Sequence, residues 1–205
     1  QKYWQILPIC PTSYGDSPYQ SFSSFAGNPY FIDLEQLCKD KLLKKSECES
    51  FPWGKDPHYV DYGVMYHSRY ALLKKAYERF CKNEPEAFAV FCEAEKDWLD
   101  DYALFMALKD AHDGAAWSEW EPELKTREEG ALEEARATYA DGIRFYKMLQ
   151  YLFYEQWRAL KAYINERGIE VIGDVPIYVA GDSADVWANP TQFYLDENLD
   201  PIDVA

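Results

Sequence analysis

The stretch IEVIGDVPIYV, residues 169–179, decides the fold of this chain. It is rich in β-branched residues and follows directly on a helical segment that ends at Gly168, where glycine supplies a common C-terminal stop. A strand that follows a helix in this way is typical of the return strand of a helix-to-parallel-strand connection. The sequence therefore predicts an α/β fold with a parallel sheet.

Gly173 and Asp174 interrupt this strand, and Pro176, which lacks an N–H, ends its ladder soon after. A carboxylate is costly to bury in an apolar strand, so we expect Asp174 to lie where the strand opens onto a site. Ligands bind at the C-terminal strand ends of α/β barrels and open sheets. The residues alone are equally compatible with an aspartate that caps a loop or pairs with an arginine.

The chain before Gly168 is predicted to be mainly helical. Apolar residues between Tyr139 and Ile164 recur at steps of three and four, which places them on one face of a long helix. Two further helices are predicted over residues 66–80 and 87–112. Residues 113–130 contain Gly, Pro and mixed charge, and are predicted to be a loop with room for a short turn.

The N-terminal region is predicted to hold a polar loop between two strands, the run WQILPI at residues 4–9 and a shorter strand that ends in FIDL at residues 31–34. Tyr14 and Tyr19 of the loop offer flat apolar faces. Short polar side chains accompany them: Asp16, Ser17, Gln20 and Asn28. This mixture suits a sugar, which has an apolar ring face and a rim of hydroxyls, but a simple turn cluster would have the same composition.

The composition excludes several classes of partner. A formal net charge of -15 and a pI near 4.6 argue against nucleic acid and against an anionic membrane surface, because both require clustered Lys and Arg. The chain has neither an apolar stretch of the roughly 18 to 20 residues that span a membrane nor a recognisable export signal. We therefore expect a cytoplasmic protein.

The residue types that bind metals and phosphates are not arranged for those ligands. The five cysteines lack a C-x-x-C pair, which favours reduced structural thiols in a cytosol. His58, His67 and His112 lie far apart and lack the H-E-x-x-H spacing of a zinc site. A Gly-rich phosphate loop is absent as well, so we expect no metal and no organic cofactor.

Both ends of the chain fall in or next to predicted elements. WQILPI begins at residue 4, and the sequence stops in DENLDPIDVA. A complete domain seldom begins and stops in this way, so we expect a fragment of a longer protein.

Two long stretches resemble the amylomaltases, the bacterial 4-α-glucanotransferases. They are WQILPICPTSYGDSPYQSFSSFAGNPYFIDL (4–34) and GDVPIYVAGDSADVWANPTQF (173–193). VDYGVMYHSRYALLKKAY, DYALFMALKD and LFYEQWRALKAYINERGI, between them, also look like the family. The departures are small: Cys10 stands where we expect glycine, and Gly181 where a larger residue is common.

The resemblance implies a partial (β/α)8 TIM barrel. Residues 1–205 would form one partial catalytic-barrel domain with the second and third strands, and residues 63–167 a mainly helical insertion between them. The implied enzyme transfers segments of α-1,4-glucan to the 4-hydroxyl of glucose or a maltooligosaccharide. It works by retention, with a carboxylate nucleophile and a carboxyl acid/base.

Position by position, the resemblance also implies substrate-binding residues. Asp174 matches a residue that hydrogen-bonds sugar near the cleavage point, Ser17 and Tyr19 match donor and acceptor subsites, and Tyr14 matches an aromatic of a secondary glucan groove. Further residues are placed at the rim without an assigned role, a structural one being equally open: Asp16, Asp182, Asp185, Trp187 and Asn189.

The catalytic residues of the family have no counterpart here. Its nucleophile lies in an Arg-x-Asp-His strand end, and no such motif occurs in this sequence. We therefore expect no catalytic residue in this chain, which would be inert alone. A non-catalytic α-glucan-binding module is one alternative function, and a hydrolase related to the α-amylases is another.

Overall fold

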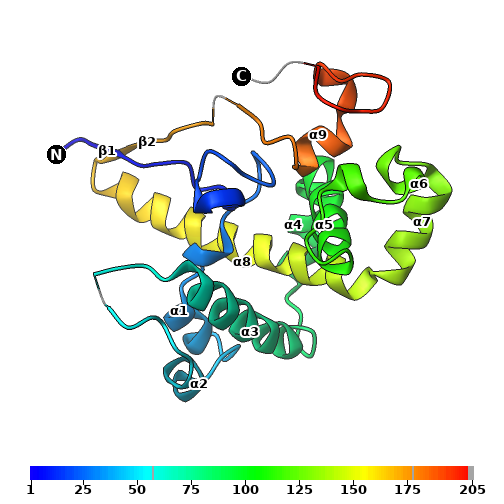
Figure 1. Cartoon of the computed structure of the whole chain (residues 1–205). Coiled ribbons are helices and arrows are strands. Elements are labelled where there is room, and N and C mark those ends of the chain that lie inside the picture. Colours follow the sequence, from blue (N-terminus) through cyan, green and yellow to red (C-terminus); the bar gives the residue numbers. More distant parts are fainter. Residues whose placement is uncertain (57, 177, 203–205) are drawn as a thin grey trace.

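The computed structural model describes residues 1–56, 58–176 and 178–202, with Tyr14 described in its backbone only. Two strands, β1 (Tyr3–Gln5) and β2 (Glu170–Ile172), flank a long helical segment (Figure 1). Its helices are α1 (Leu34–Lys39), α2 (Lys45–Ser50), α3 (Tyr62–Phe80), α4 (Glu86–Ala94), α5 (Lys96–Ala111), α6 (Pro122–Lys125), α7 (Glu129–Thr138) and α8 (Ala140–Glu166). The short helix α9 (Ala184–Ala188) follows β2. Four 3-10 turns complete the described elements: η1 (Tyr14–Asp16), η2 (Pro29–Phe31), η3 (Trp117–Glu119) and η4 (Pro190–Gln192).

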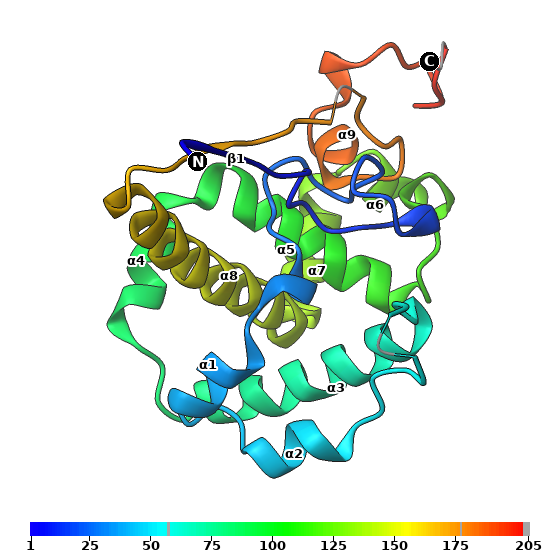
Figure 2. The same cartoon turned by 90° about the vertical axis from the view of Figure 1, so that its left-hand side faces the viewer.

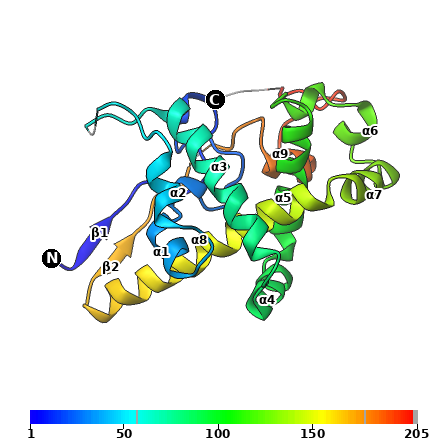
Figure 3. The same cartoon turned by 90° about the horizontal axis from the view of Figure 1, so that it is seen from below.

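The predicted parallel pairing is confirmed. β1 and β2 pair in parallel, with Trp4 opposite Val171, and both strands lie beside the C-terminal end of α8 (Figures 1 and 3). Gly168, at φ +71°, turns the chain from α8 into β2. The strands are shorter than predicted because β2 ends at Ile172, which accepts from Ile6 N, and the chain leaves the sheet at Gly173, so the rest of the predicted first strand does not pair with β2.

The core lies where α5 crosses α8 (Figure 2). Both helices contribute residues with no exposed surface, among them Leu99, Leu108, Met148 and Leu149. The predicted long helix is confirmed as α8, and the predicted helix over residues 66–80 as the larger part of α3.

Two other local predictions were wrong, and a third was incomplete. Residues 87–112 form α4 and α5, since the chain leaves helical geometry at Glu95, whose carboxylate accepts hydrogen bonds from Trp98 and Arg158. The strand predicted at residues 31–34 is instead the end of η2 and the start of α1, because Asn28 and Asp33 cap these turns. Residues 113–130, predicted as a loop with room for a short turn, contain two short turns, η3 and α6, and the start of α7.

Gln150 of α8 fastens the N-terminal loop to the core. Its side chain is fully buried; its Oε1 accepts from Gly27 N at 2.7 Å and its Nε2 donates to Gly27 O at 3.0 Å. Six residues further along α8, Gln156 makes the same pair of bonds to the backbone of Asp33. The position of the loop thus depends on α8, a helix whose contacting residue Gln150 lies 123 positions after Gly27 in the sequence.

Gly27→Ala is expected to lower the free energy of unfolding by about 1–3 kcal/mol, because the added Cβ would lie 2.0 Å from the buried ring of Phe153. Urea denaturation measures this. Gly130→Ala in α7 is the control, since its Cβ would meet nothing within 4 Å and alanine favours the helix. Equal stability of the two variants would show that Phe153 can move aside freely.

Glu47 and Arg79 join α2 to α3 through two hydrogen bonds, of 2.6 and 2.8 Å. The bonds from Arg79, followed by the bond from Lys44 N, lower the pKa of Glu47 from 4.5 to about 2. A lowered folded-state pKa gives stability that is present above the unfolded value and is lost as the pH falls through the folded one. We therefore expect Glu47→Gln to be less stable than the wild type at pH 7 and the difference to shrink between pH 4.5 and 2. Urea midpoints across that range test this, and a constant difference contradicts it.

Candidate functional site

The loop between β1 and α1 is shaped by its own polar groups. Ser13 closes it by donating to Gln20 O from both its backbone N–H, at 2.9 Å, and its hydroxyl, at 2.8 Å. Gly15 and Asp16 have φ of +68° and +54°, a backbone region that glycine adopts freely and aspartate tolerates. Ser17 accepts from Tyr19 N, so its hydroxyl supports the turn that presents Tyr19. The tyrosine side chain is 44% exposed.

The loop brings Tyr19 to Asp174. The tyrosine hydroxyl donates to Asp174 Oδ2 at 2.7 Å, across 155 positions of sequence. This bond, by stabilising the protonated phenol beside a carboxylate, raises the pKa of Tyr19. Asp174 follows β2 and lines a cavity of about 180 Å³ beside Cys10 and Gly27. Two of the residues that the sequence singled out thus meet at the C-terminal end of a parallel strand.

Asp182 and Asp185, placed at the rim by sequence, hold the loops of the site together. Asp182 accepts from Lys109 Nζ at 2.6 Å and from Trp117 N at 3.2 Å. Asp185 accepts from Ser24 N at 2.7 Å. These bonds connect the start of α9 to α5, to the loop after α5 and to the N-terminal loop. Both carboxylates therefore already have hydrogen-bond partners: a lysine and a backbone N–H for Asp182, and a backbone N–H for Asp185.

Trp187 lies in the core and keeps 1% of its surface exposed. Its Nε1 donates to Leu124 O at 3.0 Å, and the guanidinium of Arg127 stacks 4.2 Å from its ring centre. The sequence left open whether Trp187 binds sugar or has a structural role, and its burial supports the structural role. Asn189 is exposed and donates to Asp185 O at the end of α9. The side chain of Tyr14 lies outside the described part of the structure.

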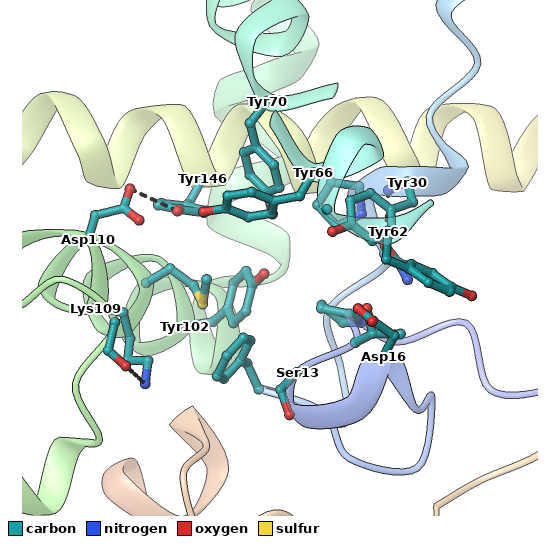
Figure 4. A pocket seen from close by; sticks show the side chains of 18 of the residues that line it. Ser13, Asp16, Tyr30, Tyr62, Tyr66, Tyr70, Tyr102, Lys109, Asp110 and Tyr146 are labelled. Atoms are coloured by element: carbon teal, nitrogen blue, oxygen red, sulfur yellow. Dashed lines mark hydrogen bonds between the residues drawn. The ribbon is translucent and has the colours of Figure 1, made fainter. Parts of the chain in front are cut away.

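A second hollow, which sequence reasoning missed, adjoins the loop. Its volume is about 730 Å³, and its most frequent lining residue is tyrosine: Tyr30, Tyr62, Tyr66, Tyr70, Tyr102 and Tyr146. Figure 4 shows Tyr66, Tyr70 and Tyr146 along one side and Ser13 and Asp16 along the other. We call it the tyrosine cavity. The missed signal was the spacing of Tyr62, Tyr66 and Tyr70, because steps of four put all three on one face of α3.

Burial sets the protonation of this cavity. It raises the pKa of Tyr30 to about 12 and that of Tyr70 well above its ordinary value, so these phenols stay neutral and can both donate and accept. Burial also raises the pKa of Asp110, which accepts from Tyr146 Oη at 2.9 Å. The cavity therefore offers aromatic faces, neutral hydroxyls and a few carboxylates.

Within the described ranges, no cluster of three or more His, Cys, Asp or Glu side chains could hold a metal ion. Nor is any helix found there long and apolar enough to span a bilayer. Aromatic faces beside carboxylates and hydroxyls are the chemistry that a carbohydrate requires, with its apolar ring faces and its many hydrogen-bonding groups.

Comparison with known proteins identifies the family. The family model described as 4-alpha-glucanotransferase matches residues 1–200. The 4-alpha-glucanotransferase of Clostridium butyricum is 48% identical over 206 residues, which cover 100% of this chain and 42% of that protein. The enzyme of the same name from Thermus thermophilus is 50% identical over 208 residues, which cover 100% of this chain and 41% of that protein.

A solved structure agrees. The amylomaltase from Streptococcus agalactiae in complex with acarbose superposes with a TM-score of 0.96 at 42% identity, covering 100% of this chain and 42% of that one. The chain therefore belongs to the 4-alpha-glucanotransferase family. It spans 41% to 42% of the length of the two curated relatives named above.

Proposed function

We propose that this chain is part of a 4-α-glucanotransferase that moves segments of α-1,4-glucan to the 4-hydroxyl of glucose or a maltooligosaccharide. The observation that carries the proposal is the Tyr19–Asp174 pair at the C-terminal end of β2, in a chain of this family. That end of a parallel strand is where α/β barrels place their ligands. In this proposal β1 and β2 are the second and third barrel strands, and residues 63–167 form the helical insertion between them.

The proposed partners are maltooligosaccharides, glucose and longer α-1,4-glucans. Asp174 hydrogen-bonds a sugar hydroxyl near the cleaved bond, Tyr19 covers a ring face with its phenyl, and Ser17 lines the neighbouring subsite. Asp174 is partly exposed and accepts from the Tyr19 hydroxyl, so a ligand hydroxyl can replace the phenol as donor. The phenol is then free to bond a second hydroxyl.

The proposed reaction proceeds with retention through two carboxylic groups that this chain does not supply. We assign Asp182 and Asp185 a structural role. Lys109 and Trp117 N hold the first, and Ser24 N holds the second. The described residues accordingly supply sugar recognition, and the bond-breaking groups come from elsewhere in the protein.

The experiment is a chimera. The segment of the Clostridium butyricum relative that aligns with this chain is replaced by residues 1–205, and the purified product receives maltoheptaose with labelled glucose. Label that enters longer chains supports the transferase. A rise in reducing ends without incorporation supports the hydrolase, and binding of glucan without either supports a binding module. A folded chimera that does none of these refutes the proposal.

We further propose that the tyrosine cavity binds a second stretch of glucan, together with the nearby Tyr14. The proposal rests on the six tyrosines and on the cavity's position beside the loop that carries Tyr19. Asp16, from the same loop, supplies a carboxylate to its wall.

Tyr66→Ala in the chimera is expected to lower the rate on amylose severalfold while changing the rate on maltotriose little, because only a long chain reaches both sites. Tyr194→Ala is the matched control: this tyrosine is 85% exposed and does not line the cavity. Initial rates on the two substrates give the comparison. Equal losses on both substrates would contradict a separate glucan site.

A further inference from the structure

The side chains of Cys38 and Cys48, on two neighbouring helices, contact each other. Their sulfur atoms lie 3.8 Å apart, Cys38 in the last turn of α1 and Cys48 within α2. Both side chains are partly buried and pack against the hydrophobic core. The turn between the helices is fixed by backbone bonds, since Leu42 N and Leu43 N both donate to Leu37 O. The contact is therefore part of the folded structure.

We propose that Cys38 and Cys48 form a reversible disulfide, closed by a small-molecule disulfide of the glutathione class and opened by the corresponding thiol. A disulfide requires sulfur atoms about 2.05 Å apart, so each side chain has to move by less than an ångström. The segment that carries them is tightly held. Arg69 donates to Ile32 O, Ser68 to Pro52 O and Arg79 to Leu42 O, all from α3.

The reaction is two thiol–disulfide exchanges. One cysteine thiolate attacks oxidised glutathione, which gives a mixed disulfide and releases one reduced glutathione. The other cysteine loses its proton to solvent, attacks the mixed disulfide and releases the second reduced glutathione. Two protein thiols are oxidised and one glutathione disulfide is reduced to two thiols. The reverse reaction reopens the link.

Closure is expected to be slow. Burial, followed by the hydrogen bond with Cys38, raises the pKa of Cys48 to about 11, so the Cys48 thiolate, which one of the two exchanges requires, is scarce at neutral pH. The device would therefore respond to sustained oxidation. The disulfide would lie within residues 32–52, the segment that Arg69, Ser68 and Arg79 of α3 hold through hydrogen bonds. Tyrosines of the same helix line the tyrosine cavity.

The experiment equilibrates the full chain with oxidised and reduced glutathione, traps free thiols by alkylation, and quantifies the disulfide by peptide mass spectrometry. The equilibration is carried out under native conditions and in urea, and each condition gives an effective concentration of one thiol relative to the other. We expect the native value to exceed the value in urea by about tenfold or more, because the fold holds the thiols together. An equal or lower native value overturns the proposal.

Two variants fix the assignment. Trypsin leaves Cys10 in the same peptide as Cys38, since residues 3–38 contain no Lys or Arg. Cys38→Ser must abolish the cross-linked peptide, whereas Cys10→Ser must retain it. The oxidised wild type should also melt several degrees above the reduced protein, and Cys48→Ser should lose this dependence. A cross-link that survives Cys38→Ser refutes the pairing.

Discussion

Asp174→Ala is expected to lower kcat/KM for glucan transfer by about 100-fold or more, measured in the chimera. Hydrogen bonds to sugar hydroxyls that strengthen in the transition state contribute several kcal/mol in glycoside chemistry, and Asp174 is the carboxylate that we place there. The loss should appear in kcat as well as in KM, because the bond is made most strongly in the transition state.

The controls separate this role from a structural one. The side chain of Asp174 is partly exposed, and its hydrogen bond to Tyr19 is exposed to solvent, so the alanine variant should melt within a few degrees of the wild type. Tyr19→Phe removes the same 2.7 Å bond but keeps the aromatic face, and should cost far less activity. Unchanged kinetics in the Asp174 variant would remove this residue from the site.

Asp182→Ala is expected to lower the free energy of unfolding by about 3–5 kcal/mol, because it leaves the buried ammonium of Lys109 without its carboxylate. The side chains of Lys109 and Asp182 are only 6% and 19% exposed, and their charged atoms lie 2.6 Å apart. Lys109 also donates to Gly114 O and Ala115 O, which cannot neutralise its charge.

Two comparisons make this test specific. Glu93→Ala removes an ion pair with Lys96 whose side chains are more than half exposed, and should change stability by less than about 1 kcal/mol. Replacing both members, as Lys109→Met with Asp182→Leu, should recover part of the loss because no buried charge then remains unpaired. A single Asp182 variant as stable as the Glu93 variant would show that water reaches Lys109.

The elements that could be predicted from the sequence are those with a local signal. The periodic apolar face and Gly168 predicted α8 and the return strand, and Gly173 with Asp174 marked the point where the strand leaves the sheet. The break at Glu95 was missed because one apolar pattern runs through both α4 and α5. Strand lengths were overestimated because a strand persists only as far as a neighbour pairs with it, and pairing is not local.

The site shows the same division. Tyr19 and Asp174 could be named from the sequence, but their direct bond depends on residues 155 positions apart. Trp187 illustrates the opposite case, since an aromatic in a polar loop motif is compatible with a sugar platform and with a core residue. Its burial follows from the packing of Phe105 and Trp120 against it, which no local pattern encodes.

The two bonds between Gln150 and Gly27 bear on any attempt to transplant this site. A peptide of residues 14–34 carries Tyr14, Ser17 and Tyr19, yet it lacks α8, which satisfies Gly27 on both sides and holds Asp33 through Gln156. Detached from that helix, the segment would keep its residues and lose its shape. The smallest segment that could carry this site to another protein is therefore the loop together with α8. A continuous segment that contains both runs from residue 14 to residue 166, which is most of the chain.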